Sequence, residues 1–179
     1  MEFGSIIISE NAANSENPQD VINSNISVIN LMREEKIDDE FIHEDALMSY
    51  YLDYYVAQHT EGNFAQFVYK SGWNKELNEL IEEGLQLIGA QKHLDLFQQQ
   101  AKKVRLMSSV KLNKFLQGKL EGVNPTRDLL NTDTFFELEE NLMALNASFL
   151  LNHPDTQVLS VDAMFELLED YLGREIKRA

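Results

Sequence analysis

Residues 47–68, LMSYYLDYYVAQHTEGNFAQFV, decide the fold class of this 179-residue chain. Apolar side chains recur here every three or four residues, the spacing of one face of an α-helix. Within the stretch the recurring set comprises Leu47, Met48, Tyr51, Leu52, Tyr55 and Val56, and Phe41 precedes it at a compatible spacing. Gly62-Asn63 interrupts the pattern, which Phe64 and Phe67 then resume. The stretch therefore predicts two consecutive amphipathic helices.

The helical spacing continues on both sides of this stretch. Pro18 suits the first turn of one helix, and Asn74 suits the N-cap of another that Gly89 ends. Thr134-x-x-Glu137 has the form of a capping box, which predicts a helix running on to Phe149. Strand-like alternation is nearly absent, apart from a hint of extended chain at Val158-Leu159. We therefore expect an all-α fold, a single compact domain of about seven helices.

The first 17 residues are expected to lie outside this domain. Met1–Ser5 resemble a cloning scar, because Glu-Phe and Gly-Ser are encoded by two common restriction sites. Ser9–Gln19 are polar and rich in Asn, Ser and Glu, a composition typical of a mobile tail. The expected division is a vector scar and disordered tail over 1–17, followed by one helical domain over 18–179.

Composition narrows the classes of function. The chain has no cysteine, which excludes disulfides and thiolate chemistry and fits a reducing cytoplasm. No apolar run approaches the roughly 20 residues that span a bilayer. The formal net charge of −15 disfavours direct binding to nucleic acid or to an anionic membrane, since both would repel the chain.

Charge is arranged in blocks along the chain. Residues 34–61 hold nine acids and one base, and residues 128–170 hold ten acids without Lys or Arg. Residues 92–127 carry eight bases against two acids. Such blocks indicate what a surface attracts. The predicted contacts to a basic partner are Glu34, Glu35, Asp38, Asp39, Glu44, Asp45, Glu137, Glu140, Asp162, Glu166 and Asp170.

No arrangement of residues predicts catalysis. No two histidines have the spacing of a zinc-hydrolase helix, and no phosphate-binding glycine loop occurs. His43 neighbours Glu44 and Asp45, so a chance divalent site competes there with an ordinary solvated histidine. We predict no catalytic residue, no metal ligand and no cofactor.

Residues 61–72, EGNFAQFVYKSG, and residues 84–90, GLQLIGA, resemble a bacterial family of DNA-mimic proteins. The positions that match the family signature are Gly62, Phe64, Gln66, Phe67, Ile88, Gly89 and Ala90. The motif, which includes Asn63, is expected to be structural. Asn63 replaces the second glycine of the family signature, and asparagine tolerates a left-handed backbone better than most residues. The resemblance covers about 50 residues, from Tyr50 to Lys103.

The resemblance implies an all-α protein, acidic and dimeric, that imitates duplex DNA and occupies the DNA-binding surface of a transcription regulator. The basic run from Lys102 to Lys119 departs from a uniformly phosphate-like surface and offers instead a place for the acidic part of a second subunit. We therefore expect a non-enzymatic cytoplasmic protein that binds a basic protein surface. The alternatives are an immunity-type inhibitor of a toxin and a hydrolase that holds metal through carboxylates.

Overall fold

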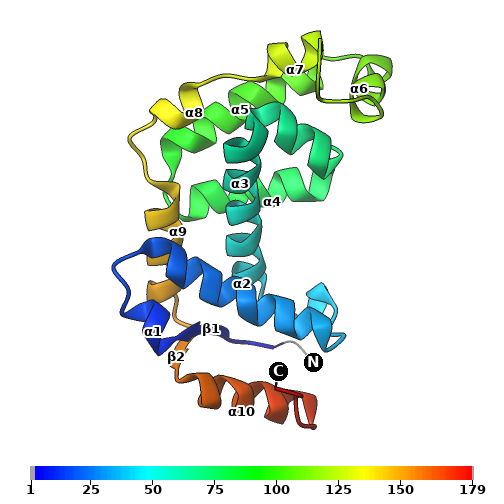
Figure 1. Ribbon diagram of the computed structural model, residues 1–179. Coiled ribbons are helices and arrows are strands. Elements are labelled where there is room, and N and C mark those ends of the chain that lie inside the picture. The colour runs from blue at the N-terminus through cyan, green and yellow to red at the C-terminus, as the bar shows by residue number, and fades with distance from the viewer. Residues whose placement is uncertain (1–2, 179) are drawn as a thin grey trace. The chain divides into compact units, whose positions relative to one another are not determined.

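The computed structural model describes residues 3–178, so Met1 and Glu2 of the expected scar lie outside the described residues. Contacts within the chain form two compact units: unit 1 (residues 1–50 and 143–179) and unit 2 (residues 51–142). The boundary between them falls inside one long helix, α3 (Glu44–Ser71). Helices dominate both units (Figure 1), which confirms the predicted all-α class. The predicted single domain over 18–179 stays a prediction.

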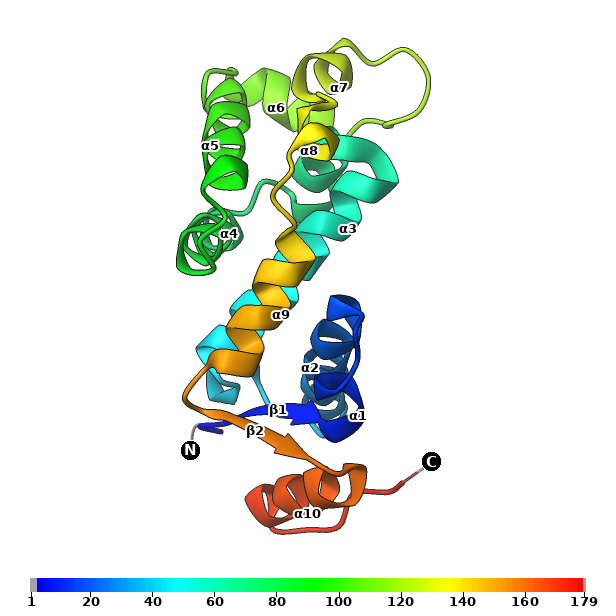
Figure 2. The same ribbon diagram turned by 90° about the vertical axis from the view of Figure 1, so that its left-hand side faces the viewer.

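Unit 1 is built on a pair of short parallel strands, β1 (Ile6–Ser9) and β2 (Thr156–Leu159). Ile6 pairs with Thr156, and the register continues to Ser9 opposite Leu159. Figure 2 shows α1 (Glu10–Ala13) and α2 (Pro18–Glu34) on one side of this pair and α10 (Val161–Leu172) on the other. The remaining elements of this unit are η1 (Asp39–Phe41), the start of α3, and most of α9 (Leu142–Asn152).

The start of the chain forms part of the core, which differs from the tail expected over residues 1–17. Ile6, Ile7 and Ile8 are fully buried, because helices cover both faces of the strand pair. Phe3 is buried too, and its N–H donates to the Phe41 carbonyl at 2.7 Å. Ser9 caps α1 by accepting a hydrogen bond from the Ala12 N–H. Three consecutive β-branched residues were the sequence signal for this strand.

Unit 2 contains the rest of α3 and a series of shorter helices. They are α4 (Lys75–Leu87), α5 (Gln91–Arg105), α6 (Ser109–Leu116), α7 (Pro125–Leu130) and α8 (Thr134–Glu137). Tyr55 lies at the centre of an aromatic core, with its ring 5.1 Å from that of Phe67 and 5.7 Å from that of Phe97, both edge-on. Such edge-to-face pairs stabilise beyond the area they bury.

Two predicted boundaries of α4 are confirmed. The Asn74 side chain accepts a hydrogen bond from the Leu77 N–H and caps the helix. Gly89 follows the helix with φ of +77°, and the next residue, Ala90, donates its N–H to the Leu85 carbonyl. This left-handed ending turns the chain directly into α5.

The predicted interruption at Gly62-Asn63 is confirmed as a kink inside α3. Asn63 has φ of 67° and ψ of −166°, a region that glycine usually occupies and not the left-handed helical region expected for asparagine. The Asn63 side chain holds the kink by bonding the Thr132 backbone through both its amide N–H and its oxygen. A Cβ on Gly62 would lie 2.8 Å from that of Gln66, so this position needs glycine.

The capping-box prediction is wrong. Thr134–Glu137 forms only one short turn, α8, whose N-cap is Asp133, and the chain extends again at Leu138 before α9 begins at Leu142. The reason lies in Glu140, whose carboxylate turns away to bond the N-terminus of α5.

Over the described residues, the helices are too short or too polar to cross a membrane.

Candidate protein-binding surface

The acidic residues are divided very unequally between the two units. Unit 1 has 17 acidic and five basic residues, a formal net charge of −12, while unit 2 has 13 acidic and ten basic residues, net −3. Nine of the eleven predicted contact residues belong to unit 1; Glu137 and Glu140 belong to unit 2. The predicted basic run lies in unit 2. The second acidic block is divided between the units, with five of its ten acids in unit 2, so the sequence blocks match the charge of the units only in part.

The first acidic block lies where α2 ends and α3 begins. Lys36, with φ of 69°, turns the chain after α2, and η1 leads it into α3. Glu34, Asp38, Glu40 and Glu44 are exposed there, and within residues 3–178 no ion pair neutralises them. Glu40 was not among the predicted contacts, although it belongs to the same run of acids.

Three other predicted contacts of this block have partners inside unit 1. Asp39 receives two hydrogen bonds of 2.8 Å from Arg33. Glu35 pairs with Arg174 at 2.5 Å, and Asp45 meets His153 at 2.9 Å. Paired carboxylates are partly neutralised and already hold a fixed geometry. They are therefore weaker candidates for binding a partner than the four exposed acids.

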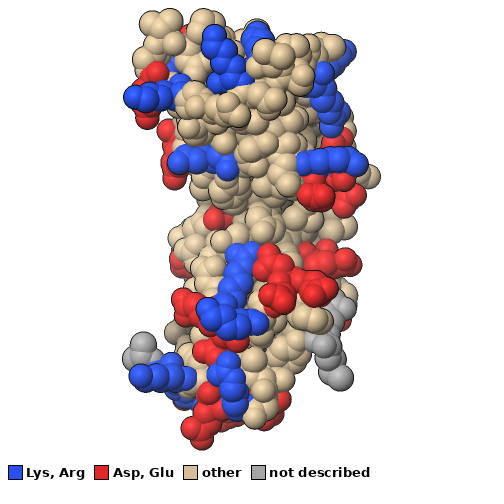
Figure 3. Space-filling model, turned by 90° about the vertical axis from the view of Figure 1, so that its right-hand side faces the viewer, with Lys and Arg blue, Asp and Glu red and all other residues tan. Residues whose placement is uncertain are grey.

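The C-terminal helix α10 supplies the second group. Asp162 pairs with Arg178 at 2.9 Å, while Glu166 and Asp170 are exposed. On the face shown in Figure 3, acidic and basic side chains lie beside one another in unit 1. The acidic surface is thus interrupted by arginines, and the exposed acids form patches rather than a uniform sheet.

The two predicted contacts in unit 2 have different roles. The Glu140 carboxylate accepts the backbone N–H groups of Lys92 and His93 at 3.2 and 3.0 Å, so it caps the positive end of α5. It is structural. Glu137 is exposed at the end of α8. In Figure 3 the basic side chains gather toward the α6–α7 end of this unit.

Two His-x-Asp segments form a reciprocal cluster in unit 1, which we call the His–Asp clasp (His43, Asp45, His153 and Asp155). His43 Nε2 lies 3.3 Å from the Asp155 carboxylate, and His153 Nε2 lies 2.9 Å from that of Asp45. Each Nδ1 accepts the N–H of its own segment's aspartate at 3.2 Å. A neutral ring that accepts at Nδ1 carries its proton on Nε2 and donates from there.

The geometry of the clasp decides whether His43 is suited to bind a divalent metal ion, the site considered from the sequence. His43 is buried rather than solvated, so the expectation of an ordinary surface histidine is wrong. Ligand atoms of His43, His153 and Asp155 lie within 4.8 Å of one another. However, a metal on His43 Nε2 would move the ring proton to Nδ1, where it would face the Asp45 N–H. The hydrogen bonds therefore favour a clasp made by the protein alone.

A second histidine cluster lies in the core of unit 2. The His59 ring stacks on Phe135 at 4.0 Å, and its Nδ1 lies 3.1 Å from the Tyr55 carbonyl oxygen. Burial lowers the pKa of His59 to about 4, and burial also lowers the pKa of neighbouring His93. His59 is therefore neutral near pH 7 and shielded from solvent, which makes it a structural residue.

A family model for DMP19-like proteins matches residues 40–153, more than half of the chain. The chain belongs to the DMP19-like protein family. This membership confirms the resemblance to DNA-mimic proteins noted at Gly62 and Phe64. Neither the curated proteins nor the solved structures contain a match to the chain. The matched range includes Glu44, Asp45, Glu137 and Glu140, whereas the other seven predicted contacts lie outside it.

Proposed function

We propose that this protein is a non-catalytic DNA mimic that binds the basic, DNA-contacting surface of a partner protein in the cytoplasm. Membership of the DMP19-like family supports this proposal. The observation that carries it for this chain is the concentration of charge, with net −12 on unit 1 against −3 on unit 2. A protein surface that binds DNA is positively charged and would attract unit 1.

The contacts we favour are the exposed acids at the α2–α3 connection, namely Glu34, Asp38, Glu40 and Glu44. They come from one short segment of the chain, on both sides of the turn at Lys36. Helix spacing applies only to the acids of α10, where residues four apart have Cβ atoms about 5–6 Å apart, comparable to the spacing of phosphates along one strand. Glu166 and Asp170 on α10 form a second exposed pair.

Capture of the partner tests this proposal. The full chain is immobilised, host lysate is applied, and bound proteins are eluted with increasing salt and identified. The proposal predicts a DNA-binding protein whose binding weakens steeply between about 50 and 200 mM salt, as DNA binding does. A single tight partner without DNA-binding activity, held with little salt dependence, would contradict mimicry and favour the immunity-type inhibitor.

A further inference from the structure

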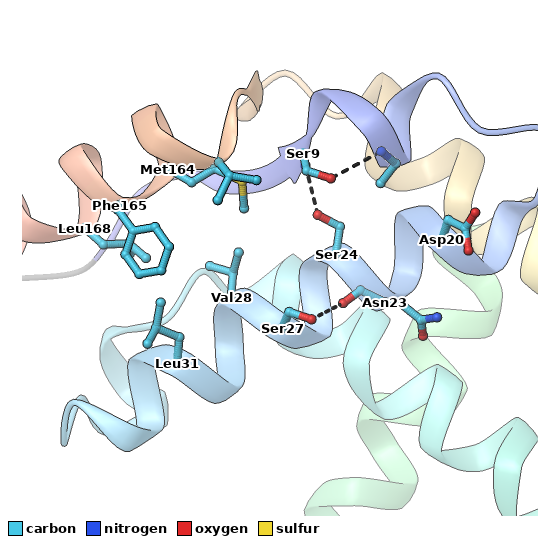
Figure 4. Close-up of a pocket in the computed structure, with 12 residues that line it drawn as sticks. Ser9, Asp20, Asn23, Ser24, Ser27, Val28, Leu31, Met164, Phe165 and Leu168 are labelled. Atoms are coloured by element: carbon cyan, nitrogen blue, oxygen red, sulfur yellow. Dashed lines mark hydrogen bonds between the residues drawn. The ribbon is translucent and has the colours of Figure 1, made fainter. Parts of the chain in front are cut away.

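Unit 1 contains an open groove between α2 and α10. The groove encloses about 370 Å³, at the small end of the roughly 300–1,000 Å³ typical of ligand-binding cavities. Val28 and Leu31 of α2 form one apolar wall, and Met164, Phe165 and Leu168 of α10 form the other (Figure 4). Apolar walls that face each other across open space gain stability when another apolar group covers them.

The rim of the groove is polar on the α2 side. Asp20, Asn23 and Ser27 line it there, and Ser24 accepts the Ser9 N–H at 2.8 Å (Figure 4). The Asp20 carboxylate is held by Ser15 Oγ at 2.6 Å and Asn17 Nδ2 at 3.2 Å. None of the twelve lining residues, all within the described part of the chain, is basic. The rim therefore offers hydrogen-bond acceptors and one fixed negative charge.

Charge complementarity decides which occupant fits this groove. Unit 1 carries a formal charge of −12, so it attracts a basic segment more strongly than a neutral or acidic one. The walls of the groove require apolar side chains on the same segment. An amphipathic helix with apolar residues at i, i+3, i+4 and i+7 meets both needs. Both walls lie outside residues 40–153, so the groove is not part of the region that the family model matches.

We propose that this groove binds a basic amphipathic helix of the partner protein, whose apolar side chains insert between Val28 and Phe165 while a cation approaches Asp20. This inference rests on the proposed function for the basic character of the partner. It adds a buried apolar anchor to a surface otherwise held by charge. Such anchors contribute most of the energy in many interfaces.

A synthetic peptide tests the groove without the natural partner. The probe is a fluorescein-labelled helical peptide of Leu, Ala and Lys with the apolar spacing above, and its control has the same composition in scrambled order. Ser27→Trp fills the groove from its rim, where Ser27 Oγ donates to the Asn23 carbonyl of its own helix. Asn30→Trp adds the same bulk at an exposed position of α2 outside the groove. Neither change alters the net charge.

We expect Ser27→Trp to weaken binding of the amphipathic peptide about tenfold and Asn30→Trp to leave it within about twofold. The Met164 methyl resonance should shift on binding while that of Met107 in unit 2 stays in place. Equal binding by both variants, or equal binding of the scrambled peptide, would overturn the proposal. A third result would also overturn it: the wild type binds an apolar dye that Ser27→Trp does not bind, while neither protein binds the peptide. That result would indicate a small-molecule site.

The two proposals can fail separately. Peptide binding at the groove, combined with failure to capture any DNA-binding protein, would remove the mimic function and keep the groove. If a DNA-binding protein is captured and binds Ser27→Trp as tightly as the wild type, the mimic function stands and the groove is not its anchor.

Discussion

Individual residues in the core of unit 2 set a pH limit on stability. The pKa of His59 is about 4 in the folded protein, against about 6.5 in an unfolded chain. Between these values the unfolded state binds a proton that the folded state does not, so stability falls as pH drops from about 6.5 toward 4. The loss from His59 is on the order of 3 kcal/mol. Urea unfolding at a series of pH values measures it.

The control for this prediction is His59→Gln, which cannot take up a proton. Carboxylates contribute to the pH dependence of both proteins alike, so the difference between the two curves reports His59 together with its electrostatic coupling to His93. The variant should be less stable than the wild type near pH 7 and lose less stability on acidification. Parallel curves for the two proteins would contradict a lowered pKa at His59.

Asn63 combines strain with two hydrogen bonds to Thr132. Asn63→Ala keeps the unfavourable backbone and loses both bonds, and we expect it to cost about 2–4 kcal/mol. Asn63→Gly loses the same bonds but relieves the strain, so it should be less destabilising by about 1–3 kcal/mol. Thermal unfolding of both variants compares them. Equal stability of the two would mean that the backbone at the kink is unstrained.

At the scale of elements, the His–Asp clasp ties the start of α3 to the turn between α9 and β2. Because each histidine donates to the other segment's aspartate, removing either His153 or Asp45 leaves a half-buried polar group without its partner. His153→Ala and Asp45→Ala should each destabilise by about 1–3 kcal/mol, with a coupling of at least about 0.5 kcal/mol in the double variant.

The clasp also makes a prediction about metals. Zn²⁺ at millimolar concentration should leave the unfolding temperature of the wild type unchanged, since each Nδ1 already accepts a backbone N–H. A rise in unfolding temperature that disappears in His43→Ala would instead identify a metal centre, with His43, His153 and Asp155 as its ligands.

Helical periodicity was enough to predict most elements, because amphipathic faces and caps such as Asn74 and Gly89 act locally. Long-range contacts account for the failures. β1 forms only because β2, about 150 residues later, pairs with it, and α8 stops early because Glu140 is needed at the N-terminus of α5. The groove depends on how α2 and α10 pack, which no local pattern reports.

At the scale of the whole molecule, the charge blocks in the sequence indicated the excess of acids in unit 1, but unit 2 holds both the basic run and half of the second acidic block. They did not reveal which acids remain free: Asp39, Glu35, Asp45 and Asp162 are paired with bases or histidines, and Glu140 caps a helix. Pairing depends on tertiary neighbours such as Arg174 and Arg178 near the C-terminus, far along the chain from Glu35. The predicted surface therefore reduces to its exposed members, with Glu40 added.

The most direct test of the acidic surface is displacement of labelled duplex DNA from the captured partner protein. One variant neutralises the α2–α3 acids through Glu34→Gln, Asp38→Asn, Glu40→Gln and Glu44→Gln. Its matched control neutralises four exposed acids of unit 2 through Glu83→Gln, Glu121→Gln, Asp133→Asn and Glu139→Gln. We predict that the first variant needs at least about tenfold more protein than the wild type to displace half of the DNA, while the control stays near the wild type. Two results would contradict a DNA-like surface at these residues. Either both variants lose the same amount of DNA displacement, or both displace DNA as well as the wild type does.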